Sequence, residues 1–197
     1  SNLNDFTNDD YVSAGEMLEF DKWALSRLQA LVAETTQAFD EYRFHSAYRA
    51  WYDFIVSISS EYFDAVKDRL YADAADSVER RSAQSVLANM LEAMVRQLAP
   101  ILVFTCDEVW EKFPEGMMEE GRVAAIALAG WPDEEDFAPQ LPKAEREELL
   151  ASYEVVMDAR DAVMKAIEEA RNDGLFTKSQ EAAATIMGNT GLIEALA

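Results

Sequence analysis

The most restrictive feature of this sequence is a helical spacing of apolar residues over most of the first hundred positions. Apolar residues recur there at steps of three and four, which places them on one face of an α-helix. The spacing predicts a first helix that begins at residues 16–21 and ends near Glu41. It predicts a second helix over residues 43–70, whose apolar row consists of Phe44, Tyr48, Trp51, Ile55, Ile58, Tyr62 and Val66. At about 1.5 Å per residue each helix is on the order of 40 Å long, and the short turn between them predicts an elongated up-and-down bundle.

Two further helices are predicted before the chain loses its helical spacing. Asp76 and Ser77 form a good N-cap pair for a third helix, which Pro100 breaks or kinks. Thr105 and Glu108 have the spacing of a capping box, so a short fourth helix is expected to begin there. Only 7 Gly and 5 Pro occur in 197 residues, which favours long helices over a turn-rich β architecture.

The second half of the chain contains a connector, a long helix and a tail. The connector is rich in Gly, Pro and acidic residues and includes a candidate strand at 123–129. A helix with a packed row is predicted from Lys143 to Arg171, ended by Gly174. In the tail, a strand is expected at 184–187 and a helix start after Asn189. The predicted fold is therefore all-α, with a lead-in at 1–16, a helical bundle and its connector at 17–142, a long C-terminal helix at 143–174, and the start of a small α/β module at 175–197.

Charge is distributed unevenly along this acidic chain, which has a formal net charge of -21. A basic cluster surrounds the turn between the second and third predicted helices and consists of Lys67, Arg69, Arg80 and Arg81. Positive charge gathered on an acidic background favours an oriented contact with an anion such as a phosphate backbone. The alternative is intramolecular pairing with nearby carboxylates, namely Asp64, Asp68, Asp73 and Glu79. The sequence gives these two interpretations equal weight.

Catalytic and metal-binding chemistry is not predicted for this chain. The single cysteine, Cys106, excludes an internal disulfide and a multi-thiolate zinc site, and is expected to be a packed or idle thiol. The single histidine, His45, excludes zinc sites built on histidine pairs. The single cysteine favours a reducing cytoplasm. The longest apolar stretches are short and interrupted by charges, so no membrane span is expected, and no leader segment opens the chain.

Several runs of residues in this sequence resemble the helical anticodon-binding domain of isoleucyl-tRNA synthetase, a class I aminoacyl-tRNA synthetase. The resemblance covers roughly residues 18–186. The most specific runs are Lys67–Tyr71 and Glu79–Gln84. Further runs are Asp21–Leu25, Phe44-His45, Ser57–Ser59, Tyr62–Asp64, Leu98–Leu102, Asp107–Trp110 and Trp131-Pro132. The tail departs from the family pattern at residues 177–182.

The resemblance implies a tRNA-binding module of a longer enzyme rather than a complete enzyme. The two ATP-binding signatures of the family and its zinc-binding cysteine module are absent from this sequence. ATP, Mg²⁺ and, in members that hold it, zinc are therefore expected only in the full-length enzyme, and this chain alone is expected to be inactive. The implied partners are tRNA(Ile) and the catalytic and C-terminal domains of the same full-length chain, and a monomer is expected.

Candidate tRNA-binding residues fall at two ends of the predicted bundle. If the chain enters from the catalytic side, the turn near residues 41–43 lies at the far end. The anticodon-proximal candidates are then Arg43, His45, Arg49 and Arg96. The basic cluster of Lys67, Arg69, Arg80 and Arg81 returns to the near end. Most of the aromatic row on the second helix is expected in the core, although Trp51 or Tyr52 could stack on a base.

Three alternatives to this interpretation remain open from the sequence alone. The first is the equivalent domain of valyl-tRNA synthetase, which shares the less specific runs. The second is a helical protein-interaction scaffold that presents an apolar groove. The third is an enzyme that uses the many carboxylates, which a metal-dependent activity would reveal.

Overall fold

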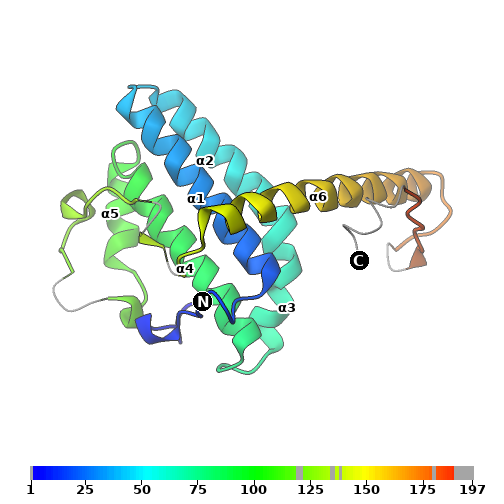
Figure 1. The fold of residues 1–197 in the computed structure, drawn as a ribbon, viewed down its shortest axis with the longest axis horizontal. Helices are drawn as coiled ribbons and strands as arrows, with labels where there is room; N and C mark the ends of the chain where they lie inside the picture. The colour runs from blue at the N-terminus through cyan, green and yellow to red at the C-terminus, as the bar shows by residue number, and fades with distance from the viewer. Residues whose placement is uncertain (1, 119–121, 134–135, 138, 179–180, 189–197) are drawn as a thin grey trace. The chain divides into compact units, whose positions relative to one another are not determined.

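The computed structural model describes residues 2–118, 122–133, 136–137, 139–178 and 181–188 of the chain. The chain divides into two compact units, residues 1–143 and residues 144–197 (Figure 1). Helices make up most of the described residues, and none of these residues lies in a β-strand. The all-α prediction is therefore confirmed for the part of the chain that the structure covers.

The first unit is built on antiparallel helices that run between two ends (Figure 1). Their bounds are α1 Glu19–Asp40, α2 Phe44–Ile58, α3 Asp64–Ala72, α4 Val78–Leu98 and α5 Val103–Glu111. A π-helical turn, Ser59–Phe63, joins α2 to α3 without a break, so the predicted second helix is confirmed as one helical run. Figure 1 shows the α1–α2 turn at one end of this unit and the α3–α4 turn at the opposite end. The predicted up-and-down arrangement is therefore correct.

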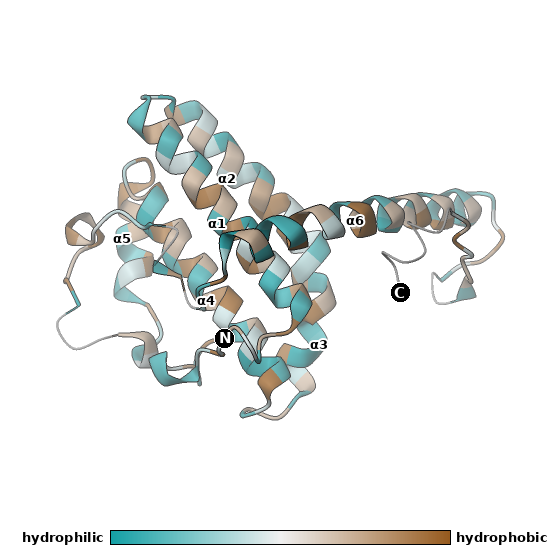
Figure 2. Ribbon diagram, in the orientation of Figure 1, coloured by the Kyte–Doolittle hydropathy of each residue, from teal (hydrophilic) through white to brown (hydrophobic). Residues whose placement is uncertain are grey.

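The core of the first unit lies where α1 packs on α2 and α4, with α3 and α5 also packed on α4. Figure 2 shows hydrophobic and hydrophilic residues alternating along each helix, as amphipathic packing requires. Trp51 of α2 is almost fully buried, and its indole Nε1 donates to Gln97 Oε1 of α4 at 2.8 Å. Gln97 also accepts from Thr35 of α1 at 2.5 Å, so one buried amide joins three helices. The indole of Trp51, the hydroxyl of Thr35 and the amide oxygen of Gln97 thus satisfy one another in this core.

Two local predictions in the middle of the chain are wrong. Helix α5 begins at Val103, because the amide of Leu102 bonds back to Leu98 at 2.7 Å and the chain turns directly from one helix into the next. Thr105 therefore lies inside α5 and does not cap it. The predicted strand at 123–129 is a short 3-10 turn, Ile126–Leu128.

Backbone groups beside that turn bond to side chains of α5 instead of to a neighbouring strand. Trp110 Nε1 donates to the Val123 carbonyl at 2.9 Å, and the Ile126 amide donates to Asp107 Oδ1 at 3.1 Å. A strand needs a partner for its backbone, and these side chains satisfy the backbone without one.

The second unit contains most of α6, which spans Lys143–Asn172. Gly174 ends this helix as predicted: it adopts a φ of +76°, and the Leu175 amide reaches back to the Ala170 carbonyl at 3.1 Å. The predicted strand at 184–187 is wrong, because these residues form no regular structure and instead line a pocket together with residues of α6. The helix start predicted after Asn189 lies outside the described residues.

Candidate nucleic-acid interface

The predicted tRNA-binding residues occupy the two opposite ends of the first unit (Figure 1). Arg43, His45 and Arg49 lie in or beside the α1–α2 turn. Lys67 and Arg69 lie on α3, and Arg80 and Arg81 lie in the first turn of α4, whereas Arg96 lies in the last turn of that helix. The structure thus keeps the two groups apart, as the bundle geometry predicts.

The α1–α2 turn is closed by its own backbone. Tyr42 adopts a φ of +59°, in the left-handed region of backbone conformation that residues other than Gly, Asn and Asp rarely adopt. The Arg43 amide bonds to the Ala38 carbonyl at 2.7 Å, and the Tyr42 amide bonds to the Phe39 carbonyl at 3.0 Å. This conformation ends α1 abruptly and directs the Tyr42 side chain outward, where it is 82% exposed.

Exposed rings and exposed basic groups alternate along this turn and the start of α2. We call these residues the turn surface: Tyr42, Arg43, Phe44, His45, Tyr48, Arg49 and Tyr52. Phe44 lies 5.5 Å from Phe39 and 6.0 Å from Tyr42 between ring centroids. Trp131 also contacts Phe39, with 4.7 Å between ring centroids. The contact with Phe39 therefore holds the ring of Phe44 in place, while the side chains of the turn surface stay accessible to solvent.

The two arginines of the turn surface have carboxylate partners that are also exposed. Arg49 pairs with Asp53 at 2.8 Å, and its side chain is 74% exposed. Arg43 pairs with Glu41 at 2.7 Å, also at the surface. Hydrogen bonds from Arg43 and Gln37 lower the pKa of Glu41, and the bond to Asp53 raises the pKa of Arg49. Such exposed pairs contribute little to stability.

The aromatic row of the predicted second helix is buried only in part. Trp51 is buried and cannot stack on a base, which removes it as a candidate, whereas Tyr52 is more than half exposed. Phe44 and Tyr48 belong to the apolar row that the helical spacing predicts, but their side chains are about half exposed. The ring of Phe44 contacts Phe39, at the end of α1, and Tyr42, in the turn, because the row extends past the end of the core. Sequence spacing alone did not reveal this exposure.

At the opposite end, Arg69 is held by a buried carboxylate. Asp21 of α1 is fully buried and accepts two hydrogen bonds from the Arg69 guanidinium, at 2.8 and 2.9 Å. It also accepts from the hydroxyls of Tyr62, at 2.6 Å, and Ser82. The π-helical turn places Tyr62 in this position. Burial by itself lowers the pKa of Arg69, but the bonds to Asp21 outweigh it and raise that pKa, and burial with Asp21 raises the pKa of Tyr62 well above its ordinary value.

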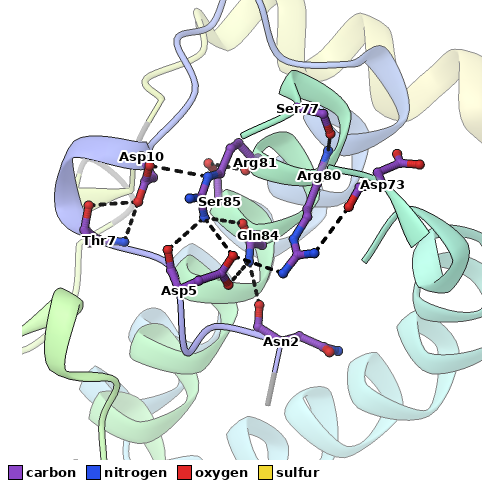
Figure 3. A network of polar contacts seen from close by, with 10 residues as sticks. All are labelled: Asn2, Asp5, Thr7, Asp10, Asp73, Ser77, Arg80, Arg81, Gln84 and Ser85. Carbon is purple, nitrogen blue, oxygen red and sulfur yellow. Dashed lines mark hydrogen bonds and ion pairs between the residues drawn. The ribbon is translucent and has the colours of Figure 1, made fainter. Parts of the chain in front are cut away.

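Arg80 and Arg81 are also engaged within the chain (Figure 3). Arg80 Nη2 lies 3.0 Å from Asp5 Oδ2, and Arg81 lies within ion-pair distance of both Asp5 and Asp10. Their side chains are only 19% and 16% exposed. The carboxylates that neutralise them come from the N-terminal segment and not from the acidic residues closest in sequence.

The last two predicted residues, Lys67 and Arg96, differ in exposure. Lys67 is exposed and pairs with Asp64 at 3.3 Å, as the intramolecular interpretation predicted. Arg96 is mostly buried and pairs with Glu92 and Asp136, at 3.3 and 3.1 Å, while its Nε donates to the Gly130 carbonyl. Arg96 therefore attaches the connector to α4.

Metal binding and thiol chemistry can be checked among the described residues. No group of three His, Cys, Asp or Glu side chains among them is arranged to hold a metal ion. Cys106 is buried, and burial raises the pKa of its thiol, so it remains protonated at neutral pH. No described helix is both long enough and apolar enough to cross a bilayer.

Comparison with known proteins agrees with a helical RNA-docking module. The family model for the anticodon-binding domain of tRNA ligase matches residues 21–186. An isoleucine–tRNA ligase of Moorella thermoacetica is 40% identical over 93% of this chain, and that of Fervidobacterium nodosum is 38% identical over 92%. In each case the match covers 19% of the relative, so the chain spans about a fifth of the length of these curated relatives. The chain belongs to the anticodon-binding domain family of tRNA ligases.

Proposed function

We propose that the turn surface binds the anticodon-bearing arm of tRNA(Ile), as part of an isoleucine–tRNA ligase whose catalytic part lies outside this chain. The observation that carries the proposal is the combination of exposed guanidinium groups and exposed aromatic rings at the α1–α2 turn. The two relatives reported above are named as isoleucine–tRNA ligases, which supports the choice of tRNA.

The two kinds of side chain have separate roles in this proposal. Arg43 and Arg49 contact backbone phosphates, which position the RNA without reading its sequence. Tyr42, Phe44 and Tyr48 offer ring faces on which unpaired bases stack, as in the recognition of single-stranded RNA loops. Exchanging Asp53 for a phosphate costs Arg49 little, because their ion pair is exposed to solvent.

The acidity of the whole chain does not oppose such local binding. The formal net charge of -21 repels RNA at long range, but at physiological salt the Debye length is about 8 Å. Charges farther from a contact than that are largely screened, so the groups at the turn surface dominate there. The chain by itself is expected to bind tRNA weakly, because it provides only part of the interface.

A salt titration of tRNA binding tests the phosphate contacts. Arg49→Gln should reduce the dependence of log affinity on log salt concentration by about 0.7 to 0.9, the value for one lost phosphate contact. Lys112→Gln is the matched control, since Lys112 is another exposed cation in an i,i+4 pair, with Glu108, away from the turn surface. Tight binding that is insensitive to salt, or equal effects of the two substitutions, would contradict the proposal.

A second pair of variants tests the aromatic rings. Tyr48→Ala should weaken binding by about 1 to 3 kcal/mol if a base stacks on this ring. Tyr71→Ala is the control, because Tyr71 is also exposed but belongs to α3, at the other end of the unit. Equal losses in the two variants would argue against stacking at the turn surface.

Assays of the full-length enzyme distinguish tRNA binding from the activation of the amino acid. Charge reversal of Arg43 and Arg49 should lower aminoacylation of tRNA(Ile) while the activation of isoleucine by ATP stays unchanged. A loss of activation would contradict the assignment. A preference for tRNA(Val) over tRNA(Ile) would instead favour the valine-specific alternative.

The remaining expectations concern the whole protein. We place ATP, Mg²⁺ and any zinc in the parts of the ligase beyond this chain, because the two ATP-binding signatures and the zinc-binding cysteine module of the family are absent from this sequence. We also propose that the chain is monomeric and acts in the cytoplasm. Sedimentation analysis tests the first of these, and localisation of the full-length protein tests the second.

A further inference from the structure

Residues 2–18 form a segment of turns and irregular structure that lies against the first turns of α4, and we call this segment the strap. Figure 3 shows its start, from Asn2 to Asp10. Its apolar side chains are part of the core: Leu3, Phe6 and Met17 are buried. A 3-10 turn, Asn8–Asp10, interrupts it. The predicted lead-in is thus a folded part of the first unit.

One carboxylate of the strap is bound by three side chains of α4. Asp5 accepts from Arg80 Nη2 through Oδ2 and from Gln84 Nε2 through Oδ1, both at 3.0 Å. Arg81 Nη1 donates to the Asp5 carbonyl at 3.0 Å and to Gln84 Oε1 at 2.8 Å. Figure 3 shows these groups converging on Asp5 from successive positions of one helix. Such charge-assisted bonds hold a carboxylate in a defined orientation.

Backbone contacts continue this attachment along α4. The Val12 amide donates to Ser85 Oγ, and the Leu18 amide donates to Ser82 Oγ, both at 3.1 Å. Arg81 Nε also lies 3.4 Å from Asp10 Oδ1. The strap is therefore fastened at several positions, with the ion pairs concentrated near its start.

The opposite side of the strap meets the loop after α5. A Cβ added at Gly116 would lie 2.5 Å from the Phe6 carbonyl oxygen and 3.1 Å from Thr7 Cα. These distances leave no room for a side chain, so Gly116 is required for the strap to lie in its place.

The start of the strap also forms one wall of an apolar pocket of about 330 Å³ between α2 and α4. Asn2 and Leu3 line it from the strap, and Trp51, Phe54, Met90 and Met94 are among the residues that line it from the helices. Displacing the strap would remove this wall and expose apolar side chains to water, which is unfavourable.

We propose that Arg80, Arg81 and Gln84 form an intramolecular carboxylate-binding site that fastens the strap over this pocket, and that the two arginines are positioning residues and not RNA contacts. The statement about RNA rests on the proposed function, whereas the statement about the strap does not. Rising salt weakens the ion pairs and loosens the strap, because both arginines keep some access to solvent.

Hydrogen exchange of the 197-residue chain tests the strap. Asp5→Asn and Gly116→Ala should both speed exchange at the Val12 amide, roughly tenfold for a loss of about 1.4 kcal/mol. High salt should speed it in the wild type. Asp53→Asn, which removes an exposed carboxylate paired with Arg49, is the matched control and should leave the strap unchanged. Unchanged protection of Val12 in both strap variants would overturn the proposal.

The salt dependence of tRNA binding tests the positioning role. Arg81→Gln should leave the salt slope unchanged while it speeds exchange in the strap, and Arg81→Lys should restore part of the protection. Arg49→Gln should lower the slope by about 0.7 to 0.9 and leave the strap alone. A slope that falls in Arg81→Gln would overturn the positioning role. If no variant affects tRNA binding, the proposed function fails, while the exchange measurements still decide on the strap.

Discussion

The two ends of the first unit contain similar numbers of basic residues but use them differently. At the α1–α2 turn, Arg43 and Arg49 have exposed partners and lie among exposed rings. At the α3–α4 end, Arg69, Arg80 and Arg81 are mostly buried and bound to carboxylates from distant parts of the chain. The exposure of the ion pair, and not the presence of the cation, therefore distinguishes a surface that can exchange partners from a structural connection.

The largest expected effect on stability comes from removing the buried carboxylate at the α3–α4 end of the first unit. Asp21→Ala should destabilise the fold by about 3 to 5 kcal/mol, because it leaves the Arg69 guanidinium and two hydroxyls without their shared acceptor. Urea unfolding followed by circular dichroism measures the change. Asp53→Ala at the exposed end should cost less than about 1 kcal/mol. Similar losses of stability in Asp21→Ala and Asp53→Ala would contradict the distinction between the buried and the exposed ion pairs.

A smaller effect should follow from removing one hydroxyl of the same buried network. Tyr62→Phe should cost about 1 to 3 kcal/mol in the free energy of unfolding, because Asp21 loses one of its buried donors. Tyr48→Phe, in the turn surface, should change stability by less than about 0.5 kcal/mol. A tolerated Tyr62→Phe would show that the other donors are sufficient for Asp21.

The pH dependence of strap docking should be smaller still. Burial by itself raises the pKa of Asp5, but the Gln84 bond and the two arginines outweigh it and hold that pKa below the ordinary value of 3.8. The ionised carboxylate therefore stabilises docking fully above pH 3.8, and this contribution is lost as the pH falls through the lower folded-state value. The stability difference between wild type and Asp5→Asn should shrink over that acid range, and NMR titration of Asp5 should give a midpoint below 3.8. A higher midpoint would contradict the ion-pair geometry.

The smallest expected effect on stability comes from the residue that is expected to matter for RNA. Arg49→Gln should change the free energy of unfolding by less than about 0.5 kcal/mol, because its ion pair is exposed. Thermal unfolding measures this change, and the tRNA titration of the same variant supplies the contrast. If Arg49→Gln strongly destabilised the fold, the ion pair of Arg49 would instead be a structural connection like that of Arg69.

The positions of the helices could be predicted because their signals are local. Apolar residues at steps of three and four, the Ser77 N-cap, and Gly174 at the end of α6 all act within a few residues of the structure they determine. Where a signal depended on a distant partner, prediction failed. The strand expected at 123–129 had apolar residues but no neighbouring strand, and the side chains of α5 satisfied its backbone instead.

The candidate site shows the same limit. The basic cluster was recognisable in the sequence, but its partners were expected among nearby carboxylates. Asp73 and Glu79 contribute backbone carbonyls to Arg80 and Arg69, while the charges that neutralise these arginines belong to Asp5 and Asp21. Those acids lie about fifty to seventy-five positions away, and only the packing of α1 and the strap on α4 brings them together.

The sequence by itself therefore determined that this chain is helical, roughly where its long helices run, and which family it resembles, because periodicity, capping and motif residues are properties of neighbouring positions. Only the tertiary structure decided which cations remain accessible and which are bound within the protein. It also decided that Phe44 and Tyr48 lie half exposed at the α1–α2 turn while Trp51 is buried. Burial and ion pairing depend on what a distant segment places against a side chain, and that is settled only when the helices pack.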